Sequence, residues 1–234
     1  MIYGLILAAG NQSRFRSDIP KALMPINADT NLLDLNIRAM SPHVDDMFVV
    51  CSHNNEKYFA SYKSIVINSG RGCGDAVLVA LDNLSLREED TVFIQWGDSY
   101  QPPSIYEKIK SFYKGTVVIP CQIEDSPYVQ IIPVENNVRV IFSKYGEQVT
   151  RGFHDLSIFY GNALAIREHL RQFKDKIEVN GVYHHKHNNE LQFLDVFNET
   201  SLSSSVLPIN DYKGISFNTT EEFNSQLGRL VEFC

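Results

Sequence analysis

Residues 1–15 read MIYGLILAAGNQSRF, and residues 20–23 continue the same segment as PKAL. The run at 2–7 carries no charge and leads into three small residues, which is typical of a buried strand that enters a tight turn. Small residues let a ligand approach the backbone, and a turn before a helix offers N–H groups to an anion. Arg14 and Lys21 add two cations. A plain strand–helix turn with solvated basic residues is the alternative, but the combined spacing favours a triphosphate-binding loop.

The first half of the chain alternates short apolar runs with stretches of helical spacing. The expected strands are 2–7, 47–51, 64–67, 91–96 and 116–120. The expected helices are 31–40, 56–62, 75–84 and 104–113. This order predicts an α/β fold with a mostly parallel central sheet that is flanked by helices on both faces.

The second half changes character and predicts a small β-rich lobe. The elements expected there are a hairpin at 128–133 and 138–143 around Glu135-Asn136-Asn137, a returning strand at 156–160, and helices at 163–173, near 191–197 and from Thr219. The serine run 203–205 is expected to be a loop. Because no long Pro/Gly/Ser-rich linker occurs, we expect residues 1–234 to form a single domain.

Composition and charge exclude several classes of protein. The net charge is −7 and no dense Lys/Arg run occurs, so nucleic acid is not an expected partner. No run approaches the roughly 18 apolar residues of a membrane span, and segment 1–7 lacks the pattern of a signal peptide. The four cysteines are far apart and form no Cys-x-x-Cys pair, which fits a reducing, cytoplasmic location. The oligomeric state stays open between a monomer and a homodimer.

The N-terminal segment resembles the signature of the sugar-phosphate and alditol-phosphate nucleotidyltransferases, Leu-Ala-Ala-Gly-x-Gly-x-Arg followed by Pro-Lys-x-Leu. Gln12 stands where that family usually has its second glycine. Residues 72–76, Gly-Cys-Gly-Asp-Ala, resemble the family's Gly-Thr-Gly-(His/Asp)-Ala turn beside the base, with Cys73 in place of threonine. The resemblance implies a Rossmann-like nucleotidyltransferase fold in which Arg14 and Lys21 are catalytic. It implies nucleotide contacts from Leu7, Ala8, Ala9, Gly10, Asn11, Gln12, Gly72, Cys73, Gly74 and Asp98.

A metal site is implied by two remote segments. Asp98 closes the strand 91–96, and open α/β sheets bind ligands outside the carboxyl ends of their strands. The family holds Mg²⁺ with a Gly-Asp at this point, and Asn218, before a Thr-Thr-Glu-Glu helix start, resembles its second metal contact. Mg²⁺ needs only one or two protein oxygens, so the resemblance implies Mg²⁺ bound by Asp98 and Asn218. A simple turn at Asp98 and a helix cap at Asn218 are the alternatives.

The acceptor side is implied more weakly. The resemblance places Lys144, Glu190 and Asp195 near the second substrate, a phosphorylated small molecule. It divides the chain into a nucleotide-binding part at about 1–120, an acceptor-side lobe at about 121–212, and a metal-ligand strand with the C-terminal helix at about 213–234. A zinc site at the histidines 184, 185 and 187 is disfavoured, because lysine and asparagine surround them and no cysteine is near.

The implied activity is transfer of a nucleoside monophosphate from an NTP to the acceptor phosphate, with release of pyrophosphate. The chain looks most like the small cytidylyltransferases of surface-polymer and capsule synthesis, so CTP is favoured over uridylyl or thymidylyl transfer to a sugar 1-phosphate. A dinucleotide-dependent oxidoreductase is disfavoured because residues 10–14 lack the Gly-x-Gly-x-x-Gly spacing. A catalytically silent nucleotide-binding protein stays open, since Gln12 and Cys73 both depart from the pattern.

Overall fold

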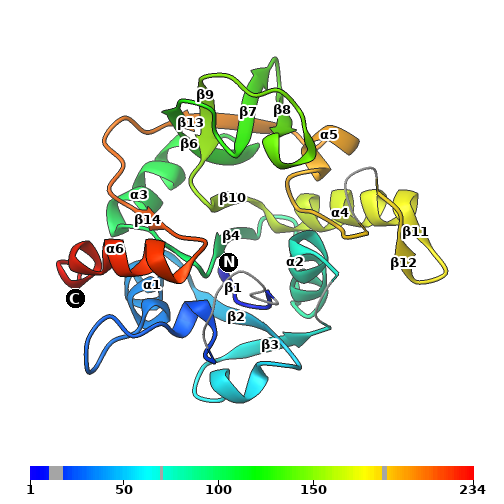
Figure 1. Cartoon of the computed structure of the whole chain (residues 1–234). Helices are drawn as coiled ribbons and strands as arrows, with labels where there is room; N and C mark the ends of the chain where they lie inside the picture. The colour runs from blue at the N-terminus through cyan, green and yellow to red at the C-terminus, as the bar shows by residue number, and fades with distance from the viewer. Residues whose placement is uncertain (11–17, 69–70, 186–188) are drawn as a thin grey trace.

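A mixed ten-stranded sheet runs through the centre of the molecule (Figure 1). The computed structural model describes residues 1–10, 18–68, 71–185 and 189–234, with the side chain of Lys144 excepted. Nine strands follow the order β3-β2-β1-β4-β10-β6-β9-β7-β8, and β13 pairs with β6. The bounds are β1 Ile2–Leu7, β2 Asp46–Ser52, β3 Ser64–Ile67, β4 Thr91–Trp96, β6 Val117–Glu124, β7 Val129–Val134, β8 Asn137–Phe142, β9 Gly152–Asp155, β10 Ile158–Asn162 and β13 Ser204–Pro208.

The parallel core of this sheet confirms the predicted fold class. β3, β2, β1 and β4 pair in parallel, and β1, β3 and β4 have the predicted bounds because each is a short, mostly apolar run. Leu7 lies opposite both Val50 and Trp96, so the carboxyl ends of β1, β2 and β4 meet at one edge. That edge is where ligands bind in open α/β sheets.

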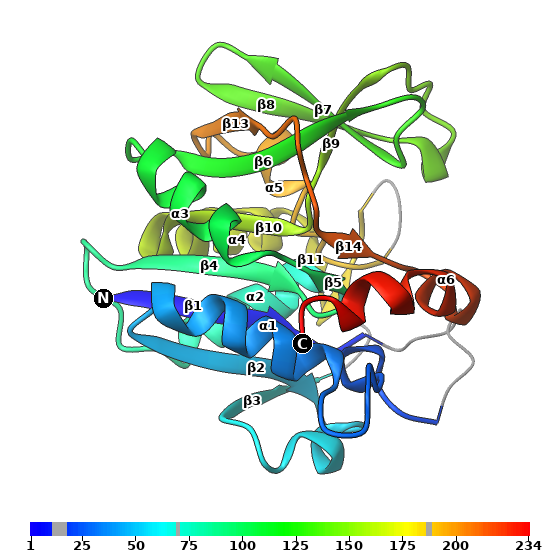
Figure 2. The same ribbon diagram turned by 90° about the vertical axis from the view of Figure 1, so that its left-hand side faces the viewer.

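Helices cover both faces of the core, as the strand–helix alternation predicts. Figure 2 shows α1 (Leu32–Met40), α3 (Pro103–Phe112) and α6 (Thr220–Val231) in front of the sheet, with α2 (Cys73–Asp82) and α4 (Ala163–Ile177) behind it. Side chains of β4 alternate between the two layers: Phe93 belongs to the core on the α1 side and Ile94 to the core on the α2 side.

Local sequence explains where α1 and α6 begin. Asn31 accepts a hydrogen bond from the backbone N–H of Asp34, whose carboxylate accepts one from the N–H of Asn31. Thr219 and Glu222 form the same reciprocal cap at α6. Each cap satisfies two backbone donors that the helix itself leaves unpaired.

Three expectations for the second half and for the connections are corrected by the structure. The serine run enters a strand, because residues 204–208 pair in parallel with β6 as β13. The segment expected as a helix at 56–62 is a short 3₁₀ turn, Glu56–Phe59, and the helix expected near 191–197 begins only at α5 (Val196–Glu199). In each case the tertiary partner outweighs a weak local preference.

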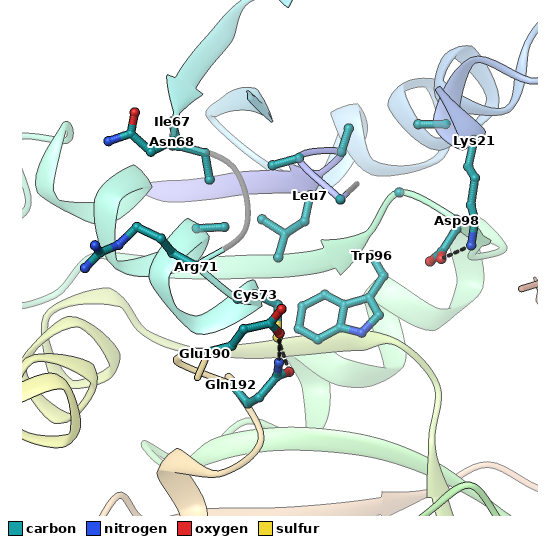
Figure 3. A pocket seen from close by; sticks show the side chains of 17 residues that line it. Leu7, Lys21, Ile67, Asn68, Arg71, Cys73, Trp96, Asp98, Glu190 and Gln192 are labelled. Atoms are coloured by element: carbon teal, nitrogen blue, oxygen red, sulfur yellow. Dashed lines mark hydrogen bonds and ion pairs between the residues drawn. The ribbon is translucent and has the colours of Figure 1, made fainter. Parts of the chain in front are cut away.

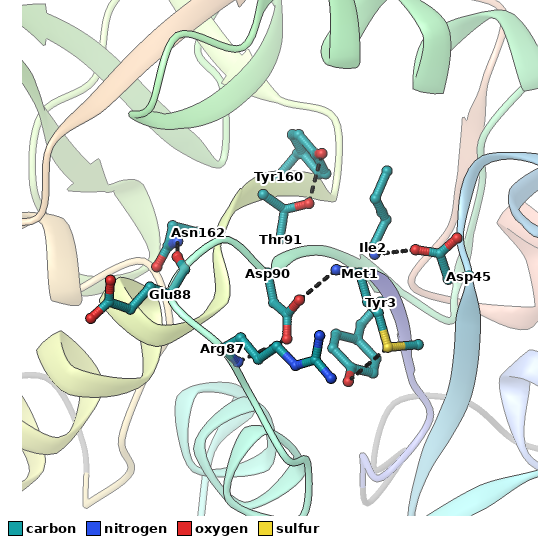
Figure 4. Close-up of polar contacts among 10 residues, drawn as sticks. All are labelled: Met1, Ile2, Tyr3, Asp45, Arg87, Glu88, Asp90, Thr91, Tyr160 and Asn162. Atoms are coloured by element: carbon teal, nitrogen blue, oxygen red, sulfur yellow. Dashed lines mark hydrogen bonds and ion pairs between the residues drawn. The ribbon is translucent and has the colours of Figure 1, made fainter.

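The amino-terminal end of β4 is tied to β10 by polar contacts, one of which is buried (Figure 4). The hydroxyls of Thr91 and Tyr160 lie 2.8 Å apart, and both residues are buried. The Asn162 amide donates to the carbonyl of Glu88 at 2.5 Å. These contacts fix the end of β4 that is remote from its carboxyl edge. None of the described helices combines the length and the apolar character that crossing a lipid bilayer requires.

Candidate functional site

A cavity of about 500 Å³ opens at the carboxyl ends of β1, β3 and β4 and reaches the start of α2 (Figure 3). Its walls come from segments that are remote in sequence. The lining residues are Leu7, Ala8, Ala9, Gly10, Lys21, Ala22, Ile67, Asn68, Arg71, Gly72, Cys73, Ala76, Trp96, Gly97, Asp98, Glu190 and Gln192.

The floor of the cavity is the turn after β1, held against the neighbouring strand. Ala8 donates its backbone N–H to Val50 at 2.7 Å, and Gly97 donates to Leu7 at 2.9 Å. A Cβ on Gly97 would lie 2.7 Å from the Leu7 carbonyl, so only glycine fits this close approach. The two loops therefore pack directly together, and the small residues predicted to face a ligand do line the cavity.

Lys21 and Asp98 meet at one end of the cavity. Lys21 begins the 3₁₀ turn η1 (Lys21–Leu23) after Pro20, and its Nζ lies 3.4 Å from Asp98 Oδ2. The Lys21 side chain is 13% exposed and that of Asp98 is 34% exposed. A cation and a carboxylate, both open to the same space, thus face the position where the predicted phosphates would enter (Figure 3).

The second predicted metal residue, Asn218, follows a segment that contacts the backbone of Asp98. The short strand β14 (Ile215–Ser216) pairs antiparallel with β5 (Ser99–Tyr100), and the N–H of Phe217 donates to the Asp98 carbonyl at 3.4 Å. Asn218 is exposed and stands one residue beyond this contact. The cap of α6 is Thr219, so the structure does not use the Asn218 amide as the cap.

These two side chains fit Mg²⁺ by their donor chemistry. A carboxylate and an amide oxygen are hard ligands, and Mg²⁺ takes only one or two of them beside phosphate and water. Across residues 1–10, 18–68, 71–185 and 189–234, no group of three His, Cys, Asp or Glu side chains is arranged to hold a metal. Asp98 lines the cavity and Asn218 is not among its lining residues, so the pairing of these two oxygens on one ion stays a prediction.

The far wall of the cavity is built where residues 190–193 dock on the start of α2. Gly74 donates its N–H to the Leu191 carbonyl at 2.8 Å, and Leu191 donates to the Arg71 carbonyl at 2.9 Å. Gly72 has a φ of +100°, and a Cβ on it would lie 2.4 Å from the Leu191 carbonyl oxygen. These glycines are therefore needed for the docking of Leu191. Gly72 also lines the cavity, whereas Gly74 is buried beneath it.

Cys73 joins this wall through its thiol. The Cys73 Sγ donates to Gln192 Oε1 at 3.3 Å and accepts the backbone N–H of Phe193 at 3.3 Å. Gln192 in turn donates to Glu190 Oε2 at 2.5 Å. Figure 3 shows Glu190 and Gln192 beside Cys73, with the Trp96 indole between them and the Lys21–Asp98 pair. This end of the cavity combines a carboxylate, an amide and an aromatic face.

Arg71 fastens the cavity to a hairpin formed by β11 (Glu178–Val179) and β12 (Val182–Tyr183). Its guanidinium donates to Asp75 at 3.3 Å and to Glu178 at 2.7 Å, and it lies 4.4 Å from the Tyr183 ring centre. The bond from Arg71 lowers the pKa of Glu178 below its usual range. Burial raises the pKa of Tyr183, whose hydroxyl also donates to Asp75.

Several predicted site residues are not brought to the cavity. Asp195 is fully buried, and its carboxylate lies 3.5 Å from His185 Nδ1, so the structure does not place it beside Glu190. The His185 side chain is 4% exposed and lies beside the same carboxylate. Lys144 lies in the 3₁₀ turn η4 (Ser143–Tyr145) of the lobe, and its side chain is outside the described residues. Asn11, Gln12, Arg14 and His187 also lie outside them.

Eight lining residues were not predicted as site residues from the sequence: Ala22, Ile67, Asn68, Arg71, Ala76, Trp96, Gly97 and Gln192. Trp96 carried a usable signal, because a large aromatic side chain directly before Gly97-Asp98 stands at the carboxyl end of a strand. No sequence pattern could have predicted Gln192, since its place depends on the docking of Leu191.

Comparison with solved structures shows the same architecture. HddC from Yersinia pseudotuberculosis superposes with a TM-score of 0.71 at 16% identity, covering 98% of this chain and 100% of that one. The inositol-1-phosphate CTP transferase from T. maritima gives 0.72 at 15% identity, covering 99% and 95%. The CTP:phosphocholine cytidylyltransferase LicC from Streptococcus pneumoniae gives 0.69 at 12% identity, covering 98% and 99%. At these identities the likeness is one of fold.

Sequence comparison finds the family and distant curated relatives. The bifunctional protein GlmU of Wolbachia pipientis wMel is 26% identical over 188 residues, which are 77% of this chain and 43% of the relative. GlmU of the Wolbachia of Brugia malayi is 24% identical over 184 residues, 76% and 45%. The chain thus spans less than half the length of these curated relatives. The MobA-like NTP transferase domain matches residues 4–151, which include the β1 turn, Lys21, Cys73 and Asp98, and the chain belongs to this family.

Proposed function

We propose that the protein is a nucleotidyltransferase that transfers a nucleoside monophosphate from an NTP to a phosphorylated small molecule and releases pyrophosphate. The observation that carries the proposal is the convergence of the β1 turn, Lys21 and Asp98 on one cavity at the carboxyl edge of the parallel strands. Membership of the MobA-like NTP transferase domain family supports the same class of reaction.

The proposed reaction gives roles to Lys21 and to the β1 turn. An oxygen of the acceptor phosphate attacks the α-phosphorus in line, and the bond from the α-phosphorus to the bridging oxygen of pyrophosphate breaks. The attacking oxygen is already anionic at neutral pH, so no general base is needed. Catalysis then depends on positioning and on offsetting negative charge. Lys21 supplies a cation within the cavity, and the β1 turn supplies backbone donors to the phosphates.

Asp98 and Asn218 are the residues that would hold Mg²⁺. When bound, the ion would neutralise nucleotide phosphate charge. Lys21 pairs with Asp98 in this structure, so the ammonium lies within reach of phosphates that bind near that carboxylate. The protein's own contribution is to hold Asp98 on a tight turn after β4 and Asn218 at the end of β14.

The wall formed by Glu190, Gln192 and Trp96 is proposed to face the acceptor. We favour CTP as the nucleotide and a capsule or surface-polymer precursor as the product. Two of the solved neighbours, the inositol-1-phosphate CTP transferase and the CTP:phosphocholine cytidylyltransferase LicC, are named for CTP, which supports this preference. HddC was also solved with GMP-PN, so neighbours with this fold accommodate different bases.

The test is pyrophosphate release from a panel of the four NTPs against a set of acceptor phosphates. The set includes phosphocholine, inositol 1-phosphate, glucose 1-phosphate and an unphosphorylated control. We expect pyrophosphate only when a phosphorylated acceptor and Mg²⁺ are both present, with CTP the best donor. NTP binding without turnover on any acceptor would instead support a catalytically silent nucleotide-binding protein.

A further inference from the structure

Four fully buried polar residues form a connected cluster behind the turn that carries Asp98. They are Asn36 of α1, Gln95 of β4, Ser99 of β5 and Tyr106 of α3. Tyr106 donates its hydroxyl to Gln95 Oε1 at 2.6 Å, and Gln95 donates to Asn36 Oδ1 at 2.8 Å. Asn36 then donates to the backbone carbonyl of Ser99 at 2.8 Å. The chain of hydrogen bonds therefore runs from one covering helix, across β4, to the loop after it.

This cluster holds the Asp98 turn from the inside. The Ser99 carbonyl accepts two side-chain amides, from Asn36 at 2.8 Å and from Gln95 at 3.3 Å. The Ser99 hydroxyl donates to the Trp96 carbonyl at 2.9 Å and closes the turn around Asp98. From the outside, Ser99 pairs with Ser216 of β14. Ser99, whose carbonyl accepts both amides, thus follows Asp98 in the chain and pairs with the strand that leads to Asn218.

Polar residues at these places are not needed to build the fold. Gln95 alternates with Phe93 on the face of β4 that packs under α1 and α3, where the neighbouring side chains are apolar. Asparagine is a poor residue for a helix interior, and each buried amide must find partners or destabilise the protein. Polar residues that are unfavourable at their positions, but whose hydrogen-bonding groups all have partners, are expected near functional sites.

We propose that Asn36, Gln95 and Tyr106 are positioning residues that set the metal affinity of Asp98 and Asn218 by fixing the backbone between them. The inference rests on the proposed function, since it assigns a role to residues around the same site. None of the three lines the cavity, so they act on the metal only through Ser99 and the β5–β14 pair. Side chains that orient metal ligands from behind change affinity without touching the ion.

The structure offers a matched pair of substitutions for the test. Tyr106→Phe removes the hydroxyl that bonds Gln95, near the carboxyl end of β4. Tyr160→Phe removes a hydroxyl that is also buried and that bonds Thr91, at the opposite end of the same strand. Both leave a buried polar partner on β4 unsatisfied, so both should lower Tm by similar amounts. Only the first touches the cluster behind Asp98.

Trp96 supplies a direct readout, because it is the single tryptophan of the chain and lines the cavity. Mn²⁺ is titrated into each protein, and the quenching of Trp96 fluorescence, excited selectively over tyrosine, reports metal binding. We expect Tyr106→Phe to raise the Kd for Mn²⁺ by about threefold to tenfold and Tyr160→Phe by less than about twofold. Ser99→Ala, which opens the turn without adding volume, should act in the same direction as Tyr106→Phe.

The outcomes separate the two proposals. Equal Kd values for Tyr106→Phe and Tyr160→Phe, in a protein whose unmodified form binds Mn²⁺, would overturn the positioning role and leave the proposed reaction intact. A lack of quenching in the unmodified protein, together with no pyrophosphate release, would overturn the metal site on which both depend. A raised Kd for Tyr106→Phe with unchanged acceptor KM would support positioning over a general loss of structure.

Discussion

Replacing Gly72 with alanine strains the start of α2 in two separate ways. Gly72 has a φ of +100° and a ψ of 163°, a backbone conformation that is essentially reserved for glycine and costs an L-residue at least about 1 kcal/mol. The added Cβ would also lie 2.4 Å from the Leu191 carbonyl oxygen, so residues 190–193 must move. That movement weakens the bonds Gly74 N–Leu191 O and Leu191 N–Arg71 O, at about 1 kcal/mol each. The expected loss of unfolding free energy is therefore about 3 kcal/mol, the sum of these three contributions.

Gly115→Ala is the matched control for backbone strain alone. Gly115 has a φ of +95°, and a Cβ there would meet nothing within 4 Å, so the expected loss is about 1 kcal/mol. For a chain of this size, each kcal/mol lowers Tm by about 2–4 °C. Circular dichroism melts should therefore show a Tm about 6–12 °C lower for Gly72→Ala and about 2–4 °C lower for Gly115→Ala.

The same substitution should also change the activity. Glu190 and Gln192 line the cavity and move with Leu191, so Gly72→Ala should raise the substrate KM, while Gly115→Ala should leave it unchanged. KM is measured by pyrophosphate release at a temperature where both variants are folded. Equal Tm shifts for the two variants would refute the reasoning, because the docking of Leu191 would then contribute nothing to stability.

Three further predictions concern charges. Asp98→Asn should abolish turnover without unfolding the protein, since it removes the carboxylate at the strand end; near wild-type rates at limiting Mg²⁺ would exclude it from the metal site. Lys21→Ala should lower kcat/KM by about a hundredfold, equivalent to about 2.7 kcal/mol, and a change confined to the acceptor KM would contradict its proposed role. Arg71 depresses the pKa of Glu178, so their bond stabilises the protein above the ordinary glutamate pKa of about 4.3 and is lost as pH falls through the depressed value. Glu178→Gln should flatten that part of the acid unfolding curve, and an unchanged curve would show that the bond does not contribute.

The sequence predicted β1, β3 and β4 to the residue because each is a short, mostly apolar run. It did not predict β13, β5 or β14. β13 begins with two serines and pairs with β6, and β5 and β14 are two residues each and pair with one another. Such elements take their conformation from the strand with which they pair, and their own residues show no pattern that predicts a strand.

The residues of the candidate site also divide into those whose place the sequence predicted and those whose place depends on how the chain packs. Local spacing and the family resemblance together predicted the β1 turn, Lys21 and Asp98, all of which line the cavity. The β1 turn and Asp98 follow strands whose carboxyl ends meet at one edge, and Lys21 belongs to the Pro-Lys-x-Leu part of the signature. The position of Asp195 relative to the cavity could not be predicted from its place in the sequence. Asp195 lies close to Glu190 in sequence, yet it is buried against His185 while Glu190 lines the cavity. A residue's distance from the site depends on how its segment packs.

The amino-acid sequence by itself therefore determined the α/β class, the parallel core and the sheet edge at which the cavity opens, since these follow from hydrophobic periodicity and from small residues at strand ends. Only the tertiary structure decided the wall of the cavity and the support behind the Asp98 turn. The docking of Leu191 on α2 joins segments over 100 residues apart, and the Asn36–Gln95–Tyr106 cluster joins three elements across the sheet. Their hydrogen bonds depend on distances that arise only when the chain has packed, so no local pattern encodes them.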